Sequence, residues 1–217
     1  MCRLTNCRFS RSSHLHIFRY KPGSVPAMFH ERGDSLSGPY DPRSVANLLL
    51  KEARARKLNV SNLKLQKLLF LCHAFFLVET GRGLVSGSFE AWHYGPVHRQ
   101  AYDAFKQFGA ASITEEANRF NPVTGTQQPL AAPDDRSVFD VVNKVMTFYG
   151  DWSPGKLVEL THAKDGPWDQ VVRAAATSAN MALKISDDII EERFKYLWFG
   201  TKPKQDVEPN EDYPLVA

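Results

Sequence analysis

The sequence has few cysteines and no long apolar run. Three cysteines, Cys2, Cys7 and Cys72, stand among 217 residues, and an odd, unevenly spaced set is not a disulfide framework. No stretch reaches the roughly 18 apolar residues that a membrane-spanning helix needs, and the N-terminus has no apolar signal core. These absences favour a protein of the reducing cytoplasm with no membrane partner.

The signature motifs of several enzyme classes are also missing. No glycine-rich stretch matches a phosphate loop or a dinucleotide fingerprint, and there is no Gly-x-Ser-x-Gly nucleophile turn. His93 and His98 lie five residues apart across a Gly-Pro step, which is not a metal-ligand spacing. Cys72 and His73 are neighbours on a predicted helix, so their side chains diverge and cannot form a nucleophile–base pair. The sequence therefore implies no metal, no cofactor and no enzymatic activity.

Charge is small overall and unevenly placed. The net charge is +3, and residues 1–38 hold six basic and two acidic side chains, a net +4 that leaves −1 for the rest. We expect residues 1–38 to be a disordered or non-native extension, with translation starting at Met1 or at Met28. Residues 201–217 are rich in proline and acids and are expected to be a disordered tail. The folded domain is predicted over residues 39–200.

Apolar residues in this domain recur mostly with helical spacing, which predicts a mainly α fold. The most apolar helix, between Ser61 and Gly81, is expected to be buried and central. Residues 81–95 favour a small β-hairpin or extended element. A loop insertion is predicted at 110–133, with a short helix at 115–119. Further helices are expected over 42–57, from Pro96, after Asp134 or Asp135, from Ser153-Pro154, from Pro167 and after Ser186.

Two aromatic segments lie within this domain, at residues 92–96 and 166–168. Rigid turns that carry large rings are typical of core corners and also of protein-binding surfaces. We expect the first segment to form a corner in which Gly95-Pro96 makes the turn, while His98 and Arg99 project outward. Trp92 and Tyr94 are expected to pack beneath the first long helix. Tyr102 and Phe105 are expected to close the corner after the turn.

Two further groups suggest alternative functions. Basic residues gather over 51–67, which favours a solvated helix face or, alternatively, phosphate contacts of a nucleic-acid-binding regulator. His162, Asp165 and Asp169 could form the acid–base set of a hydrolase. A histidine at the end of a short helix is also simply favourable against the helix dipole. The basic residues are Lys51, Arg54, Arg56, Lys57, Lys64 and Lys67.

The motifs as a set resemble those of a known family. Three stretches, LKLQKLLF at 63–70, EAWHYGPV at 90–97 and YDAFK at 102–106, are similar to the Panacea domain of SocA-like antitoxins, which also occurs in phage-associated proteins. Residues 159–162 and 166–168 resemble the C-terminal part of the same pattern. The resemblance runs from about residue 45 to 199. The chain departs from the pattern after Gly-Pro-Val, where it has His98-Arg99-Gln100.

This resemblance implies a helical cytoplasmic antitoxin, without a cofactor, that neutralises a cognate toxin by direct binding. It also implies that the motif positions build the fold: Gln66, Lys67, Trp92, Tyr94, Gly95, Pro96, Tyr102, Phe105 and His162. Recognition of the toxin is then left to other positions, for which we predict His98, Arg99, Asp165 and Trp168 together with the insertion and the tails. Operator DNA and a second copy of the chain remain alternative partners.

Overall fold

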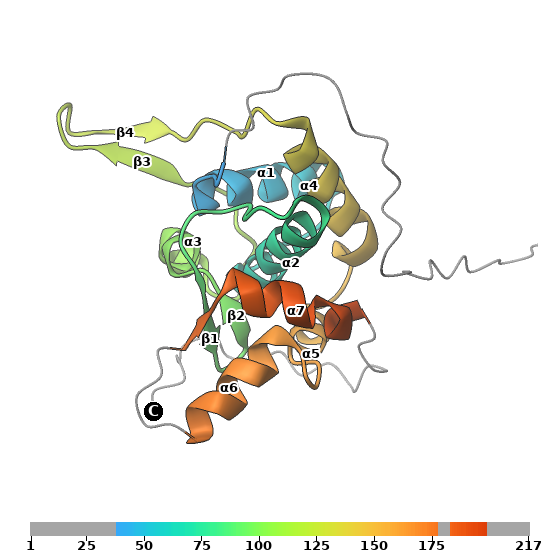
Figure 1. Cartoon of the computed structure of the whole chain (residues 1–217). Coiled ribbons are helices and arrows are strands. Elements are labelled where there is room, and N and C mark those ends of the chain that lie inside the picture. The colour runs from blue at the N-terminus through green and yellow to red at the C-terminus, as the bar shows by residue number, and fades with distance from the viewer. Residues whose placement is uncertain (1–37, 178–182, 199–217) are drawn as a thin grey trace, which may run out of the picture. The chain divides into compact units, whose positions relative to one another are not determined.

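The chain is mainly helical, as predicted. The computed structural model describes residues 38–177 and 183–198. The extension predicted over 1–38, apart from Gly38, and the tail predicted over 201–217 lie outside the described residues. Within the described part, seven α-helices accompany two small antiparallel sheets (Figure 1). The helices are α1 (Pro42–Ala55), α2 (Asn62–Thr80), α3 (Arg99–Phe105), α4 (Arg136–Tyr149), α5 (Pro154–Thr161), α6 (Pro167–Thr177) and α7 (Asp187–Trp198).

The helix ends follow local signals in the sequence. Asp41 accepts a hydrogen bond from a first-turn N–H of α1, and Pro42 occupies the first helical position, where its missing N–H costs nothing. Ser61 caps α2 in the same way. α2 ends at Gly81, whose φ of +67° is a left-handed conformation that glycine adopts without a Cβ clash. The predicted caps of α4, α5 and α7 are confirmed at Asp135, Ser153 and Ser186.

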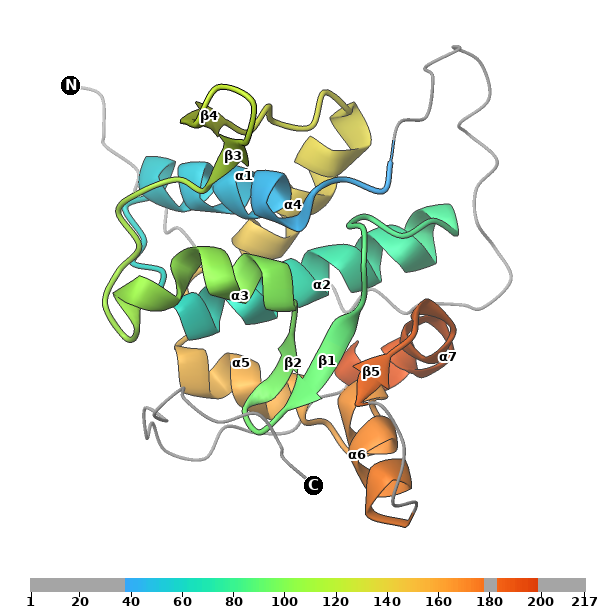
Figure 2. The same cartoon turned by 90° about the vertical axis from the view of Figure 1, so that its left-hand side faces the viewer.

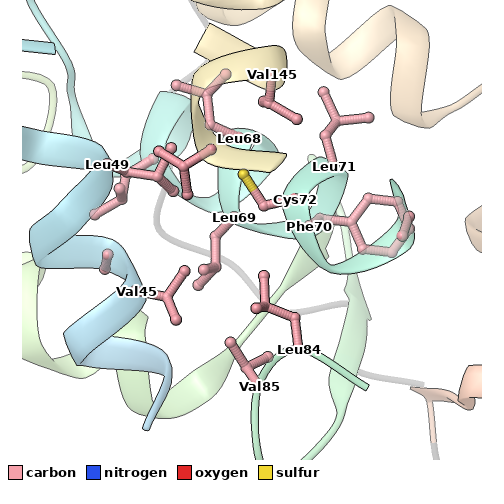
Figure 3. Packing of buried hydrophobic residues seen from close by; sticks show 14 of the residues in the cluster. Val45, Leu49, Leu68, Leu69, Phe70, Leu71, Cys72, Leu84, Val85 and Val145 are labelled. Carbon is pink, nitrogen blue, oxygen red and sulfur yellow. The ribbon is translucent and has the colours of Figure 1, made fainter. Parts of the chain in front are cut away.

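α2 is the central helix of the core. Its residues 62–77 are all buried, because α1, α4, α5 and α7 pack around it. Figure 3 shows Val45 of α1 and Val145 of α4 facing the α2 side chains around Cys72. Cys72 is fully buried, and burial raises the pKa of its thiol far above the ordinary value. The cysteine therefore lies in the core as an inert apolar residue, as the sequence indicated.

The first sheet contains the predicted extended element but corrects its turn. β1 (Phe89–Trp92) lies between β2 (Gly95–Val97) and β5 (Lys184–Ile185), with antiparallel pairing on both sides. β1 and β2 form a hairpin whose two turn residues are His93 and Tyr94, because Trp92 pairs with Gly95. The predictions that Gly95-Pro96 makes the turn and that Pro96 starts a helix are therefore wrong. Pro96 is tolerated because β2 is an edge strand.

The second sheet replaces the short helix predicted at 115–119. β3 (Asn118–Asn121) pairs with β4 (Thr126–Pro129) in a hairpin, with Asn121 opposite Thr126. The helix prediction is wrong because Asn47 of α1 binds the backbone of Ala117 and residues 118–121 pair with β4, which keeps this segment extended. Gly125 has φ +64°. Figures 1 and 2 show the hairpin reaching out beside α1.

Candidate functional site

The motif residues of α2 hold the β1–β2 hairpin in place. Lys67 is fully buried, and its Nζ donates a 3.0 Å hydrogen bond to the carbonyl oxygen of Pro96. The Gln66 side-chain oxygen accepts a 3.0 Å bond from the backbone N–H of His98, while its Nε2 donates to Asn62. Buried polar groups that are satisfied in this way fix one geometry. Gln66 and Lys67 therefore build the fold.

Gly95 lets α5 approach β2 closely. A Cβ placed on Gly95 would lie 2.8 Å from Oγ1 of Thr161 and 3.1 Å from Nζ of Lys67. Gly95 also has φ +100°, a conformation that residues with a Cβ rarely adopt. Only glycine fits between α2 and α5 at this point.

Trp92 is the centre of a cluster that joins the hairpin to α3 and α6. Its side chain is 6% exposed, and its Nε1 donates a 2.8 Å hydrogen bond to Oε2 of Glu90. The Tyr102 ring lies 4.8 Å from the Trp92 ring, between centroids, and the Arg99 guanidinium lies 4.8 Å from the Trp92 centroid. The Trp168 indole N–H donates a 2.8 Å bond to the Trp92 carbonyl. We call these five residues, Glu90, Trp92, Arg99, Tyr102 and Trp168, the Trp92 cluster.

The rings of the corner do not all lie where the sequence placed them. Trp92 packs on Tyr102 of α3, rather than beneath the first long helix. Tyr94 is half-buried in the turn, with its ring 4.6 Å from that of His93. Phe105 is buried, as expected for a residue that closes the corner. The difference arises because the turn falls at residues 93–94, so Tyr94 lies at the end of the hairpin.

His98 does not project outward, which corrects the prediction that it contacts a partner. It is 4% exposed, its Nε2 donates a 2.9 Å hydrogen bond to the Ser86 carbonyl, and its ring meets the Phe89 ring edge-on. Burial lowers the pKa of His98. Arg99, the next residue, is exposed as predicted, with 54% of its side chain accessible, and its Nη2 lies 3.1 Å from Oε2 of Glu90.

His162 and the two nearby carboxylates do not form an acid–base set. The His162 ring stacks on Trp168 at 3.7 Å between centroids with only 6° between planes. Its Nε2 is buried and has no hydrogen-bond partner in the described part of the chain. Asp165 and Asp169 instead each lie 2.7 Å from Nη2 of Arg173. The hydrolase hypothesis required a carboxylate on His162, and this geometry removes its basis.

Burial lowers the pKa of His162 to about 3, with the positive charge of Lys67 and then His93 as further causes. In the unfolded chain His162 takes up a proton near pH 6.5, whereas in the folded chain it does so only near pH 3. Stability from this residue is therefore complete above pH 6.5 and is lost as the pH falls toward 3. At pH 5 we expect a loss of about 2 kcal/mol relative to pH 7.5.

This pH effect can be measured by urea unfolding of the wild type and His162→Phe at both pH values. Phenylalanine keeps a flat ring against Trp168 but cannot take up a proton. We expect the variant to lose clearly less stability than the wild type between pH 7.5 and 5. Equal losses of stability in the two proteins would contradict the attribution of this pH effect to His162.

The basic residues over 51–67 do not form one exposed surface. Lys64 is 7% exposed and Lys67 is 0% exposed, since both lie on the central helix. Arg56 Nη2 donates to the side-chain oxygen of Asn143, and Arg54 pairs with Glu116 at 3.4 Å. The expectation of a solvated helix face is therefore wrong for the two α2 lysines. Apolar residues all round α2 bury its lysines with it.

Among residues 38–177 and 183–198, no group of three or more His, Cys, Asp or Glu side chains could hold a metal ion. Every helix in the same residues is too short or too polar to cross a bilayer.

Comparison with known proteins assigns the chain to a family. Residues 65–169 match the family described as antitoxin SocA-like, Panacea domain. The chain is also 39% identical over 156 residues to Antitoxin SocA of Caulobacter vibrioides (strain NA1000 / CB15N), covering 72% of this chain and 83% of that protein. The chain belongs to the SocA-like, Panacea-domain family. No solved structure matches it.

This membership confirms the resemblance and supports an antitoxin role for the chain. The matched residues 65–169 include the whole Trp92 cluster. Glu90, which joins Trp92 and Arg99, was not singled out by the sequence, although it opens the EAW motif. The available signal was the position of the Glu90 carboxylate two residues before Trp92 in a predicted strand, because residues i and i+2 share one face of a strand.

Proposed function

We propose that the chain is an antitoxin that neutralises a cognate toxin by direct, stoichiometric protein–protein binding and turns over no substrate. The observation that carries this proposal is the 39% identity to Antitoxin SocA over 83% of that protein. The family match over residues 65–169 spans most of α2 and the whole β1–β2 hairpin, which the motif residues hold together. An antitoxin of this type requires a toxin partner.

The exposed edge of the Trp92 cluster supports a binding role. Arg99 is over half exposed, yet it is held by the Glu90 carboxylate and the Trp92 ring. Trp168 is half-buried with its N–H already bonded, and Asp165 is fixed by Arg173. Arginine and tryptophan side chains that are ordered before binding lose little entropy when a partner docks. We therefore retain Arg99, Asp165 and Trp168 as proposed toxin contacts.

The test is co-expression with the reading frame beside this gene. We expect the neighbouring product to arrest growth alone, growth to resume when this chain is present, and the two proteins to co-purify in equal amounts. Native mass spectrometry gives the stoichiometry. Rescue without a stable complex, or rescue by a trace of this chain, would contradict neutralisation by binding.

A matched pair of arginine variants tests the proposed contacts. Arg99→Ala should weaken the complex by about tenfold, the usual effect of removing one interface hot spot. Arg136→Ala is the control, because its side chain is 86% exposed on α4 and pairs with Asp140 rather than with any residue of the Trp92 cluster. Both variants should melt near the wild-type temperature.

Binding of operator DNA stays a separate prediction of the sequence. Lys64 and Lys67 are buried, so phosphate contacts from the basic residues over 51–67 would rest mainly on Lys51 and Lys57, which are exposed. Two lysines provide a weak electrostatic footprint. Direct toxin binding is therefore the function proposed first.

A further inference from the structure

The β3–β4 hairpin makes no core of its own. All residues of both strands are exposed except Asn121, which is half-buried. Phe120 is 57% exposed, and Val123 in the turn is 92% exposed. Figure 1 shows the two strands extending beyond α1 and α3. A two-stranded hairpin without a packed face is only marginally stable in water. Contacts with the rest of the domain are therefore needed to hold this one in place.

Those contacts lie at the base of the hairpin. The Asn47 side chain of α1 binds the backbone of Ala117 twice, accepting from its N–H at 2.8 Å and donating to its carbonyl at 2.9 Å. Arg43 donates to the Asn118 carbonyl, and Arg119 lies 3.9 Å from the Asp41 carboxylate. Contacts from α1 and its N-cap thus fix the base of the hairpin on the domain, while the strands of the hairpin stay exposed.

Beyond its base, the hairpin offers unpaired strand edges. β3 and β4 pair only with each other in the part of the chain that the structure describes, so each strand has a free edge. Such edges bind an extended segment of another protein by adding a strand. A cavity of about 370 Å³ opens beside the base, between Gln128 of β4 and the start of α1 at Asp41, and could take a side chain of the added strand.

The side chains of the hairpin favour one kind of partner. Residues 118–130 contain one cation, Arg119, and no carboxylate. A single arginine, already near Asp41, is too little for nucleic acid, which requires several phosphate contacts. A second copy of the hairpin has no carboxylate to place opposite Arg119. Arg119 stays 63% exposed at its 3.9 Å distance from the Asp41 carboxylate, so a different protein that presents an extended segment with an acidic residue can meet the backbone edge, the apolar tip and Arg119 together.

We propose that the β3–β4 hairpin is a docking arm for the toxin, which adds an extended, acid-containing segment to one of its edges and covers Phe120 and Val123. This inference rests on the proposed function, because it names a second surface, besides Arg99, Asp165 and Trp168, through which the toxin is bound.

The experiment compares three forms of the full-length chain in binding to the purified product of the neighbouring reading frame. Phe120→Ala/Val123→Ser removes the apolar tip without touching the anchors at Ala117 and Asn118. Phe148→Ala on α4 is the matched control, because Phe148 is also 57% exposed. We expect the double variant to bind at least tenfold more weakly than the wild type, and the control to bind within twofold.

Hydrogen exchange on the wild-type complex reports strand addition directly. Amides of residues 118–129 should exchange at least tenfold more slowly when the toxin is bound, whereas the exposed face of α4 should not change. Wild-type affinity in the double variant, or unchanged exchange in the hairpin of a stable complex, would overturn the docking arm and leave the proposed function intact.

Two other results would also overturn the inference. If the wild type neither binds nor neutralises the neighbouring product, the proposed function fails and the docking arm fails with it. If analytical ultracentrifugation shows a dimer of the wild type alone that the double variant loses, the hairpin joins two copies of this chain instead.

Discussion

Replacing Trp92 with alanine is expected to lower the free energy of unfolding by about 3–5 kcal/mol, the usual cost of emptying a large buried aromatic site. The ring is 6% exposed and contacts both Tyr102 and Arg99. Its removal also leaves the Glu90 carboxylate without the indole N–H. Chemical denaturation followed by circular dichroism measures the change.

Two further variants separate packing from hydrogen bonding. Trp92→Phe keeps an aromatic ring at the site but loses the bond to Glu90, so we expect a loss near 1 kcal/mol from that bond together with a smaller packing loss. Trp152→Ala removes a tryptophan that is only half-buried, and its cost should be clearly smaller than that of Trp92→Ala. An unchanged melting curve for Trp92→Ala would contradict the placement of this ring in the core.

Gly95→Ala is expected to destabilise the fold by about 3 kcal/mol or more. The added methyl group would approach Thr161 Oγ1 to 2.8 Å inside a packed region, and overpacking of this kind costs about 1–3 kcal/mol. The backbone would also be held at φ +100° with a Cβ, which adds about 1–3 kcal/mol of strain. Thermal and urea unfolding measure the sum.

Gly81→Ala is the matched control, because Gly81 has a positive φ of +67° but no atom within 4 Å of the added Cβ. It should cost about 1–2 kcal/mol from backbone conformation alone. A Thr161→Ala change in the Gly95→Ala background should recover part of the loss, because it removes the nearest atom. Equal losses of unfolding free energy for Gly81→Ala and Gly95→Ala would show that α5 does not pack closely against β2 at Gly95.

Much of the fold was predictable because its signals are local. Asp41, Ser61 and Ser153 cap helices through contacts within four residues, and Gly81 ends α2 for a conformational reason of its own. The apolar residues on every face of α2 indicated a central helix without any knowledge of its neighbours. The family pattern was equally visible, because its motifs are contiguous stretches of sequence.

The errors occurred where distant segments decide the structure. The turn moved to residues 93–94 because β1 pairs with β2 in a register that places Trp92 opposite Gly95. A helix at 115–119 gave way to a strand, because Asn47 binds Ala117 from 70 residues away and the following residues pair with 126–129. No local propensity reports such pairings.

The sequence by itself determined the helical class, the helix caps, the central position of α2 and the family, since each depends on residues close together in the chain. Only the tertiary structure decided which polar residues are buried. Lys67 belonged to the basic residues expected on a solvated helix face, and His98 was expected to project outward. Both are buried instead, where Lys67 binds the Pro96 carbonyl of β2 and His98 binds the Ser86 carbonyl. Burial depends on what packs against a residue, and those neighbours come from elsewhere in the chain.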